Sequence, residues 1–501
     1  MTLLRAAPVA IALLATIAAV RWLDAHPHPI WWDEANYFNQ VVDDRQAFLQ
    51  GGAVAGLKSL LFADNVRPPA YRMIVAPVAA VALPSLALLR TIAFCVTAAA
   101  FVLLWRACRI VASPPSALLA AAIVFSIPEI LSTGAWFGTE YALIFAIALL
   151  LDSLLRDQPV GVAAAVALGL LSKASFFVIG GPALLTAMLL SREQIRKLML
   201  SAAAGALIAA AWWYWDPIDA LEFAQLGRVF ERLSYQEHLS SPVLGTKLAR
   251  FAAALGPGIL LAAALLGIEA IRQREPVSPQ ARRAVILAAV MAVPLIVLSL
   301  LSPTFVPRHF APALLAAGIP IAIALDRARN PVRLGVAFLA LLQVTWMAIA
   351  PQRFLPRVEQ TDWRGLRAAV PQTAPRIVML GGWPSLSPPE IRYGWTRDGL
   401  EASTLWLWRA EDRQIDWRHV MRDALAADAV LVVPPGESKN EGLTPYERAD
   451  NRHNAELIRR LQATGTFAEP VAMRIGTSMK TDVLVYRRHN SRSNPRPFGQ
   501  E

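Results

Sequence analysis

The sequence predicts a polytopic α-helical membrane protein with about eleven transmembrane helices and a small C-terminal α/β soluble domain. Of its 501 residues, 55% are hydrophobic and only 17% are charged, against about 25% charged in an ordinary soluble protein. A soluble chain of this length has too little interior to bury so much apolar side chain, so part of it must face lipid. The same composition excludes a coiled coil, a disordered chain and a disulfide-stapled secreted domain.

The net charge of +11 is distributed as in a membrane protein. Many Lys and Arg side chains lie in short loops between apolar stretches rather than in one basic groove, so we expect no nucleic acid among the partners. The two cysteines, Cys95 and Cys108, are 13 residues apart on one predicted helix. That spacing corresponds to about 20 Å, so they cannot form a disulfide with each other.

Eleven apolar stretches are long enough, or nearly so, to cross about 30 Å of hydrocarbon as helices. The expected spans are residues 3–22, 86–105, 114–132, 136–155, 159–175, 176–190, 196–215, 247–270, 284–302, 308–325 and 331–350. The first stretch, with Arg5 near its start, also fits a cleaved signal peptide. We favour a retained helix because the segment that follows it carries candidate chemistry and needs a membrane tether.

The loops between these spans predict an orientation. With the N-terminus in the cytoplasm, thirteen Lys and Arg residues fall in inside loops, whereas the outside turns 133–135 and 303–307 hold none. The thirteen are Arg106, Arg109, Arg156, Arg192, Arg196, Lys197, Arg272, Arg274, Arg282, Arg283, Arg327, Arg329 and Arg333. Cytoplasmic loops are enriched in these cations, and an odd number of spans then places the C-terminal region outside.

The chain is therefore expected to divide into a transmembrane domain, 1–350, a soluble extracytoplasmic α/β domain, 351–488, and a disordered tail, 489–501. Two long outside loops, 23–85 and 216–246, belong to the first domain. The amphipathic stretch Gln46–Phe62 in the earlier loop predicts short helices that lie in the membrane interface. The tail is polar and rich in Ser, Arg and Pro, a composition typical of disorder.

Apolar runs and alternation predict the elements of the soluble domain. A helix is expected to start near Asp362, and another to cover Glu456–Gln462. The expected strands are Arg376–Leu380, Ala429–Val433, Val471–Ile475 and Asp482–Arg487, the last two as a hairpin. The domain shows no constellation of nucleophile and base, so its expected task is to recognise an acceptor or to cover the site.

Ionisable side chains gather at the outer ends of several spans, where each costs about 2.5–3.5 kcal/mol unless it has a partner or a function. They are Asp33, Glu34, Arg67, Glu140, Lys173, Arg308 and His309. Charges without a common function would distribute over both membrane faces, whereas these share one predicted face. Any one alone could be an interfacial anchor or half of an ion pair, but we interpret the group as one site.

The types of charge in this group restrict its chemistry. Arg67, Lys173 and Arg308 are three cations at headgroup depth, which suits the phosphate of a lipid. Asp33 and Glu140 are carboxylates, which such a phosphate repels, so their presence beside it needs a functional reason. General-base catalysis on an acceptor hydroxyl or amine is one such reason. The set predicts transfer of a group from a lipid-linked phosphate donor.

Five short motifs, in this order over residues 1–350, resemble those of the polytopic C-type glycosyltransferases, which use polyprenyl-phosphate sugars. The nearest patterns are those of protein O-mannosyltransferases, the lipid A aminoarabinose transferase and the rhizobial galacturonic acid transferases. The motifs are Trp32-Asp33-Glu34-Ala35-Asn36-Tyr37, Arg67-Pro68-Pro69-Ala70-Tyr71, Gly138-Thr139-Glu140, Gly169-Leu170-Leu171-Ser172-Lys173 and Arg308-His309-Phe310-Ala311-Pro312.

The resemblance implies a catalytic role for the carboxylates. Asp33, which with Glu34 forms the family's acidic pair, would be the general base that activates the acceptor, and Glu140 would support or share that role. Tyr37 would line the site. Glu140 stands where the family has Asp, which displaces its carboxyl by one methylene.

The resemblance also implies that Lys173, Arg67 and Arg308 hold the donor phosphate. His309 stands where a Tyr is frequent and would line the site. Val66 precedes Arg67 where some relatives have a metal-binding Glu, which leaves dependence on a divalent metal open, and we assign no metal ligand.

Two histidine patterns are less specific. His238 in the 216–246 loop follows Arg228 and Arg232, and it either lines a donor or acceptor site or lies on a solvated face. His26-Pro27-His28 lies near the acidic pair, but its spacing is not a usual zinc pattern.

The favoured interpretation is an integral glycosyltransferase of the bacterial inner membrane. It would move a sugar from a polyprenyl-phosphate donor, with inversion, to an extracytoplasmic lipid, glycan or protein acceptor, in lipopolysaccharide or protein glycosylation. A membrane transporter is the main alternative. The position of the charges at one membrane face, rather than near the midplane, argues against it. A lipid-linked oligosaccharide polymerase or ligase is a third, and the acidic pair after the first span favours the transferase over it.

Overall fold

The computed structural model describes most of the chain in two compact units. The described residues are 2–25, 30, 32–64, 67–213, 241–273, 276–301, 307–350, 363–383, 386–408, 414–436, 450–475 and 481–489. The first unit combines Met1–His26 with Asp43–Pro356, and the second combines Pro27–Val42 with Arg357–Glu501. The domain boundary expected at 350 and the tail expected at 489–501 stay predictions.

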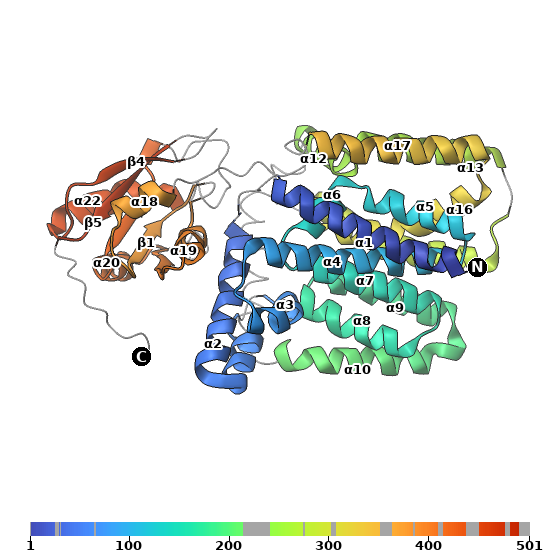
Figure 1. Cartoon of the computed structure of the whole chain (residues 1–501), viewed down its shortest axis with the longest axis horizontal. Coiled ribbons are helices and arrows are strands. Elements are labelled where there is room, and N and C mark those ends of the chain that lie inside the picture. The colour runs from blue at the N-terminus through green and yellow to red at the C-terminus, as the bar shows by residue number, and fades with distance from the viewer. Residues whose placement is uncertain are drawn as a thin grey trace. The chain divides into compact units, whose positions relative to one another are not determined.

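A row of neighbouring helices forms much of the first unit (Figure 1). Helix α10 packs along α8, α8 along α7, α7 along α4, and α4 along α1. Their bounds are α1 Thr2–Ala25, α4 Leu86–Cys108, α7 Glu140–Leu155, α8 Pro159–Ser172, α9 Phe176–Leu190 and α10 Ile195–Trp213, with a 3-10 turn η1 at Arg192–Gln194. Close approach of α10 to α8 relies on Gly205, because a Cβ there would lie 2.4 Å from the Ala163 carbonyl oxygen.

The remaining helices of this unit pack around that row. Helix α14 packs on α9, α16 on α5, and α13 on α17. Their bounds are α5 Pro114–Phe125, α6 Pro128–Ala135, α12 Ser241–Leu255, α13 Pro257–Gln273, α14 Pro279–Leu301, η2 Pro307–His309, α15 Ala311–Leu314, η3 Leu315–Ala317, α16 Gly318–Arg327 and α17 Asn330–Ile349. The expected spans 114–132 and 308–325 are thus each broken into shorter helical segments.

The expected span 247–270 is bent, because α12 and α13 meet at 88°. The break is at Gly256, whose φ of +82° is a backbone conformation that favours glycine. Gln343 of α17, only 2% exposed, closes the break from the side. Its Oε1 accepts hydrogen bonds from the backbone N–H groups of Gly258 (2.8 Å) and Ile259 (3.2 Å), and its Nε2 donates to the Leu255 and Ser126 carbonyl oxygens.

Three described helices, α4, α14 and α17, are long and apolar enough to cross a membrane, and the bent pair α12–α13 adds a fourth if it counts as one span. Five shorter apolar helical segments accompany them, Ala7–Trp22, Ala70–Val81, Pro114–Phe125, Pro159–Ser172 and Phe176–Leu190. These helices indicate a multi-pass membrane protein. The number of eleven crossings stays a prediction.

The stretch Gln46–Phe62 is helical, as expected, and it lies in α2 (Trp32–Phe62), which is kinked at Gly52 because the backbone there is not helical; its place in the membrane interface stays a prediction. Helix α2 is followed by α3 (Ala70–Val81). A buried ion pair joins these two helices, with Arg72 Nη1 3.2 Å from Asp44 Oδ1. The Ser59 hydroxyl also donates a hydrogen bond to Asp44. Burial raises the pKa of the Asp44 carboxyl, and the Arg72 charge and the Ser59 hydrogen bond oppose that shift.

The second unit is built on a five-stranded sheet with strand order β2-β1-β3-β5-β4. Strand β1 pairs parallel with β2 and β3, while β5 pairs antiparallel with β3 and β4. The bounds are β1 Arg376–Leu380, β2 Ser403–Trp406, β3 Ala429–Val432, β4 Val471–Ile475 and β5 Thr481–Arg487. The four strands expected from the sequence are confirmed within one residue at each end, and β2 is additional.

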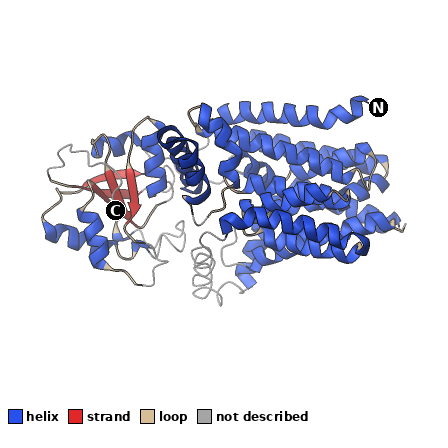
Figure 2. Ribbon diagram, turned by 90° about the horizontal axis from the view of Figure 1, so that it is seen from below, coloured by secondary structure: helices blue, strands red, loops and turns tan. Residues whose placement is uncertain are grey.

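Helices cover both faces of this sheet, drawn in red in Figure 2. Helices α18 (Trp363–Ala369) and α19 (Pro388–Arg397) pack on the face that carries Ile377 and Leu431. Helices α20 (Trp417–Leu425) and α22 (Asn454–Thr464) pack on the face that carries Val378 and Val430. Because successive side chains of a strand point to opposite faces, strands that are apolar at every position need both layers.

Candidate functional site

A tight turn between α8 and α9 carries Lys173. The ring of Phe176, 2% exposed, fills the space over two glycines, and a Cβ on Gly169 or Gly180 would lie 2.2 Å or 2.7 Å from it. The turn is closed by the Phe176 N–H, which donates to the Lys173 carbonyl oxygen at 3.0 Å. Gly169, the first residue of the motif that ends at Lys173, thus lets the ring pack. The packed ring in turn fixes the position of the turn from which the Lys173 side chain extends.

The Lys173 side chain meets Glu140, the first residue of α7. Lys173 Nζ donates to Glu140 Oε1 at 2.7 Å, and Arg308 Nε lies 3.9 Å from the same oxygen. The Thr139 hydroxyl lies 3.3 Å from the other oxygen, Oε2. The carboxylate is 6% exposed, whereas about a quarter of the lysine side chain is exposed. The result is a buried carboxylate flanked by two partly exposed cations.

Arg308 reaches this carboxylate from η2, which begins the segment before α16. The next residues are well anchored, since Phe310 is fully buried and packs its ring 5.0 Å from that of Phe251. The short helix α15 that follows packs on α7. His309 lies beside Arg308 on η2. Three of the predicted site residues, Glu140, Lys173 and Arg308, are therefore brought together by four helical segments of the first unit.

Arg67 lies just before α3, whose first turn is tied to the same end of α7. The Tyr141 hydroxyl, next to Glu140, donates to the Tyr71 carbonyl oxygen at 2.6 Å. The rings of Tyr71 and Phe137 pack with their centroids 5.9 Å apart. Arg67 itself is held by Asp64, through a 3.6 Å ion pair and a 3.0 Å hydrogen bond from its backbone N–H. The segment is thus anchored at the α7 start, while a direct contact of Arg67 with Glu140 stays a prediction.

Asp33, Glu34 and Tyr37 lie in the first turns of α2, in the second unit. All three are buried and have interaction partners. This end of α2 packs against α19, where the rings of Phe38 and Tyr393 are 5.1 Å apart and edge to face. The Asn39 side chain also donates to the Pro389 carbonyl oxygen at 2.9 Å. The predicted convergence of Asp33 and Glu34 with Glu140 stays a prediction, because these residues belong to separate units.

Some predicted positions lie outside the described residues, namely His238, His26 and His28. Within the described part of the chain, no cluster of three or more His, Cys, Asp or Glu side chains could hold a metal ion. The sequence indicates no role for Thr139, although it lies in one of the five motifs, and it does not single out Tyr141 and Asp64; all three position the charged groups rather than belong to them. The feature of the sequence that could have indicated them is their position, since each lies within three residues of a charged site residue.

Two crystal structures of ArnT from Cupriavidus metallidurans match the chain over nearly its whole length. Each match covers 98% of this chain and 100% of ArnT at 14% sequence identity, with a TM-score of 0.59 for ArnT bound to undecaprenyl phosphate and 0.60 for apo ArnT. The chain has the ArnT fold. The fold implied by the five motifs is thereby confirmed. No protein-family model and no curated protein sequence matches the chain.

Proposed function

We propose that the protein is a glycosyltransferase of the bacterial inner membrane that transfers a sugar from a polyprenyl-phosphate donor to an extracytoplasmic acceptor, with inversion. The observation that carries this proposal is the arrangement of Lys173 and Arg308 around Glu140, at 2.7 Å and 3.9 Å. The ArnT fold supports it, since one of the ArnT structures is bound to undecaprenyl phosphate. The acceptor would be a lipid, a glycan or a protein.

The charges around Glu140 suit the leaving side of this reaction. When the bond between the anomeric carbon and the donor oxygen breaks, the electron pair stays on that oxygen, and a phosphodiester with one negative charge becomes a phosphomonoester with two. Cations fixed beside the phosphate stabilise the second charge as it develops. Lys173 and Arg308 exceed Glu140 by one positive charge, and Arg67, which is itself paired with Asp64, would supply a further donor to the phosphate. Glu140 engages both cations, so its proposed role is to orient them.

The acceptor side needs a base, and Asp33 is the proposed one. Removing the proton from the acceptor hydroxyl or amine as it attacks the sugar typically accelerates such a step by about 10²–10⁴-fold. Glu34 would support Asp33, while Tyr37, His309 and His238 would line the site. The second unit would then lie outside the cytoplasm and contribute to acceptor recognition.

The test is sugar transfer by the full-length protein in proteoliposomes, with radiolabelled polyprenyl-phosphate sugars offered one at a time with candidate acceptors. We expect labelled product with at least one donor, and its loss in Lys173→Gln. Lys197→Gln, an exposed lysine at the start of α10, is the matched control and should keep transfer. If no donor is used by protein that binds polyprenyl phosphate, a transporter or a polymerase becomes the better interpretation.

A further inference from the structure

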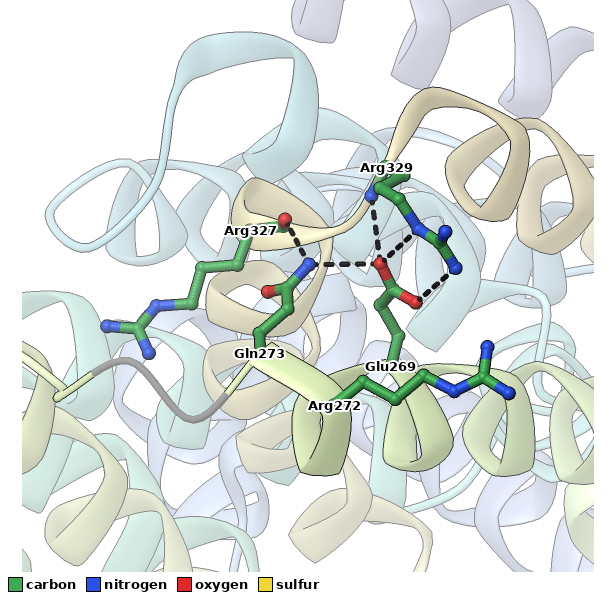
Figure 3. A pocket seen from close by; sticks show the side chains of 5 residues that line it. All are labelled: Glu269, Arg272, Gln273, Arg327 and Arg329. Atoms are coloured by element: carbon green, nitrogen blue, oxygen red, sulfur yellow. Dashed lines mark hydrogen bonds and ion pairs between the residues drawn. The ribbon is translucent and has the colours of Figure 1, made fainter.

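A second charged site lies at the end of the first unit where α13 and α16 end and α17 begins. A pocket there is lined by Glu269, Arg272, Gln273, Arg327 and Arg329 (Figure 3). Arg308 precedes α15 and α16, and Arg327 ends α16, so this chain segment runs from the Glu140 site to the pocket. The pocket is therefore separate from the proposed catalytic site.

Part of the pocket is a rigid frame. Arg329 donates to both oxygens of the buried Glu269 carboxylate, from Nε at 2.9 Å and from Nη2 at 3.0 Å. Gln273 Nε2 donates to Glu269 Oε1 at 3.0 Å and to the Arg327 carbonyl oxygen at 2.7 Å. These contacts join the end of α13 to the residues between α16 and α17. The frame also fixes the direction in which the Arg329 side chain leaves the backbone.

The pocket carries more positive charge than the Glu269 carboxylate neutralises. Three arginines line the pocket against one carboxylate, and the guanidinium of one of them, Arg327, donates to the Pro276 carbonyl oxygen at 2.9 Å. Arg329 uses Nε and Nη2 for Glu269, so its Nη1 remains available, and its side chain is 66% exposed. The Arg272 side chain is exposed and has no hydrogen bond or ion pair to another described residue. Figure 3 shows the guanidinium groups of Arg272 and Arg329 on the same side of Glu269. Guanidinium groups arranged in this way match the oxygens of a phosphate.

Exposed apolar side chains extend from the pocket along the two helices that form it. On α13 they include Leu261, Ile268 and Ile271, and on α17 Leu334 and Leu341. Ile271 directly precedes Arg272, so the apolar surface begins where the charged pocket ends. An anionic group bound in the pocket would thus lie next to an apolar protein surface. A phospholipid could place its acyl chains on that surface, whereas a free phosphate would make no use of it.

We propose that this pocket binds the phosphate headgroup of an anionic phospholipid, with the acyl chains along α13 and α17. The phosphate oxygens accept hydrogen bonds from Arg272 and from Arg329 Nη1, while Glu269 keeps Arg329 in place. The site would be occupied by lipid of the leaflet opposite to the proposed donor site. It does not depend on the proposed transferase activity.

The experiment measures binding of phosphatidylglycerol to the full-length protein by native mass spectrometry, with phosphatidylcholine and glycerol phosphate as comparison ligands. Loss of one charge-assisted contact corresponds to about a 10- to 150-fold loss of affinity, which we expect for phosphatidylglycerol in Arg272→Gln. Arg282→Gln is the matched control, because Arg282 is exposed at the same end of the unit but does not line the pocket. It should bind phosphatidylglycerol as the wild type does.

Three results would overturn the proposal. The first is equal affinity of Arg272→Gln and wild type. The second is an equal loss in Arg282→Gln, which would indicate attraction to surface charge in general. The third is glycerol phosphate binding as tightly as phosphatidylglycerol, which would indicate a site for a soluble phosphate. Arg272 is exposed and its replacement leaves the Glu269 frame intact, so misfolding is not expected to obscure the result.

Discussion

The Lys173 ammonium lies 2.7 Å from the Glu140 carboxylate and joins the turn between α8 and α9 to the first residue of α7. Before any donor binds, this lysine therefore already has a counter-ion, and a phosphate would share it rather than displace water from a free cation. Because a quarter of the lysine side chain remains exposed, it can contact a second anion while it keeps the first.

Lys173→Ala should weaken donor binding. A charge-assisted hydrogen bond contributes about 1.5–3 kcal/mol, so the expected loss of affinity for a polyprenyl-phosphate donor is about 10- to 150-fold. Arg67→Ala should act in the same direction. Unchanged donor affinity in both variants, measured with labelled donor, would leave these residues as ordinary interface anchors.

Gly169→Ala tests whether the packed turn positions Lys173. The new Cβ would lie 2.2 Å from the Phe176 ring, so the ring or the turn must shift. We expect donor binding to weaken as in Lys173→Ala, and the double variant Gly169→Ala with Phe176→Leu to recover part of it. Gly181→Ala is the control on the same helix pair, because a Cβ there meets nothing within 4 Å. Normal donor binding by folded Gly169→Ala protein would separate the turn from the site.

Gln343→Ala tests what holds the bend between α12 and α13. The side chain satisfies two N–H groups at the start of α13 and two carbonyl oxygens. Leaving buried polar groups without partners costs about 1–3 kcal/mol each. Thermal unfolding of the variant in detergent should thus occur at clearly lower temperature than for wild type. Thr345→Val, an exposed position on the same helix, should unfold near the wild-type temperature.

The orientation can be tested with reporters. A C-terminal region outside the cytoplasm follows from the thirteen Lys and Arg residues in the proposed inside loops. Alkaline phosphatase fused after residue 490 should therefore be active, and a reporter that fluoresces only in the cytoplasm should be dark. The reverse pattern would contradict an odd number of crossings that starts from a cytoplasmic N-terminus.

The sequence predicted part of the site because of where its charges stand. Glu140, Lys173 and Arg308 each mark the end of an apolar stretch on one predicted face, and charges at the ends of packed helices must find partners close by. The Gly256 bend could not be predicted, since a single glycine in an apolar run is usually tolerated in a helix. Its partner Gln343 is distant in sequence.

The unit to which the acidic pair Asp33 and Glu34 belongs could not be predicted from the sequence either. Their position after the first helix predicts that Asp33 and Glu34 belong to the transmembrane domain, whereas the start of α2 packs on α19 in the second unit. That packing depends on Phe38 and Tyr393, a ring contact between residues far apart in the chain. Short apolar strands such as Arg376–Leu380 were predictable because burial on both faces leaves a continuous apolar run.

Asp33→Asn is the sharpest test of the proposed mechanism. Asn keeps the size and hydrogen-bonding shape of Asp but cannot accept a proton from the acceptor. The leaving phosphate is a stabilised anion that needs little acid assistance, so base catalysis should carry the larger share of the acceleration. We expect turnover to fall by about two to four orders of magnitude, while expression and donor affinity stay at wild-type values.

A purely structural role for Asp33 leads to a different result. Asp33 lies in the first turn of α2, where a carboxylate also interacts favourably with the helix dipole. If that were its only role, Asn would be nearly neutral, since the dipole interaction contributes only about 0.3–1 kcal/mol. Single-turnover measurements with saturating donor separate the two roles, because a loss of stability reduces the amount of active protein and leaves the rate constant unchanged. A wild-type rate constant in Asp33→Asn would remove the general base from the mechanism and leave the acceptor proton to another group.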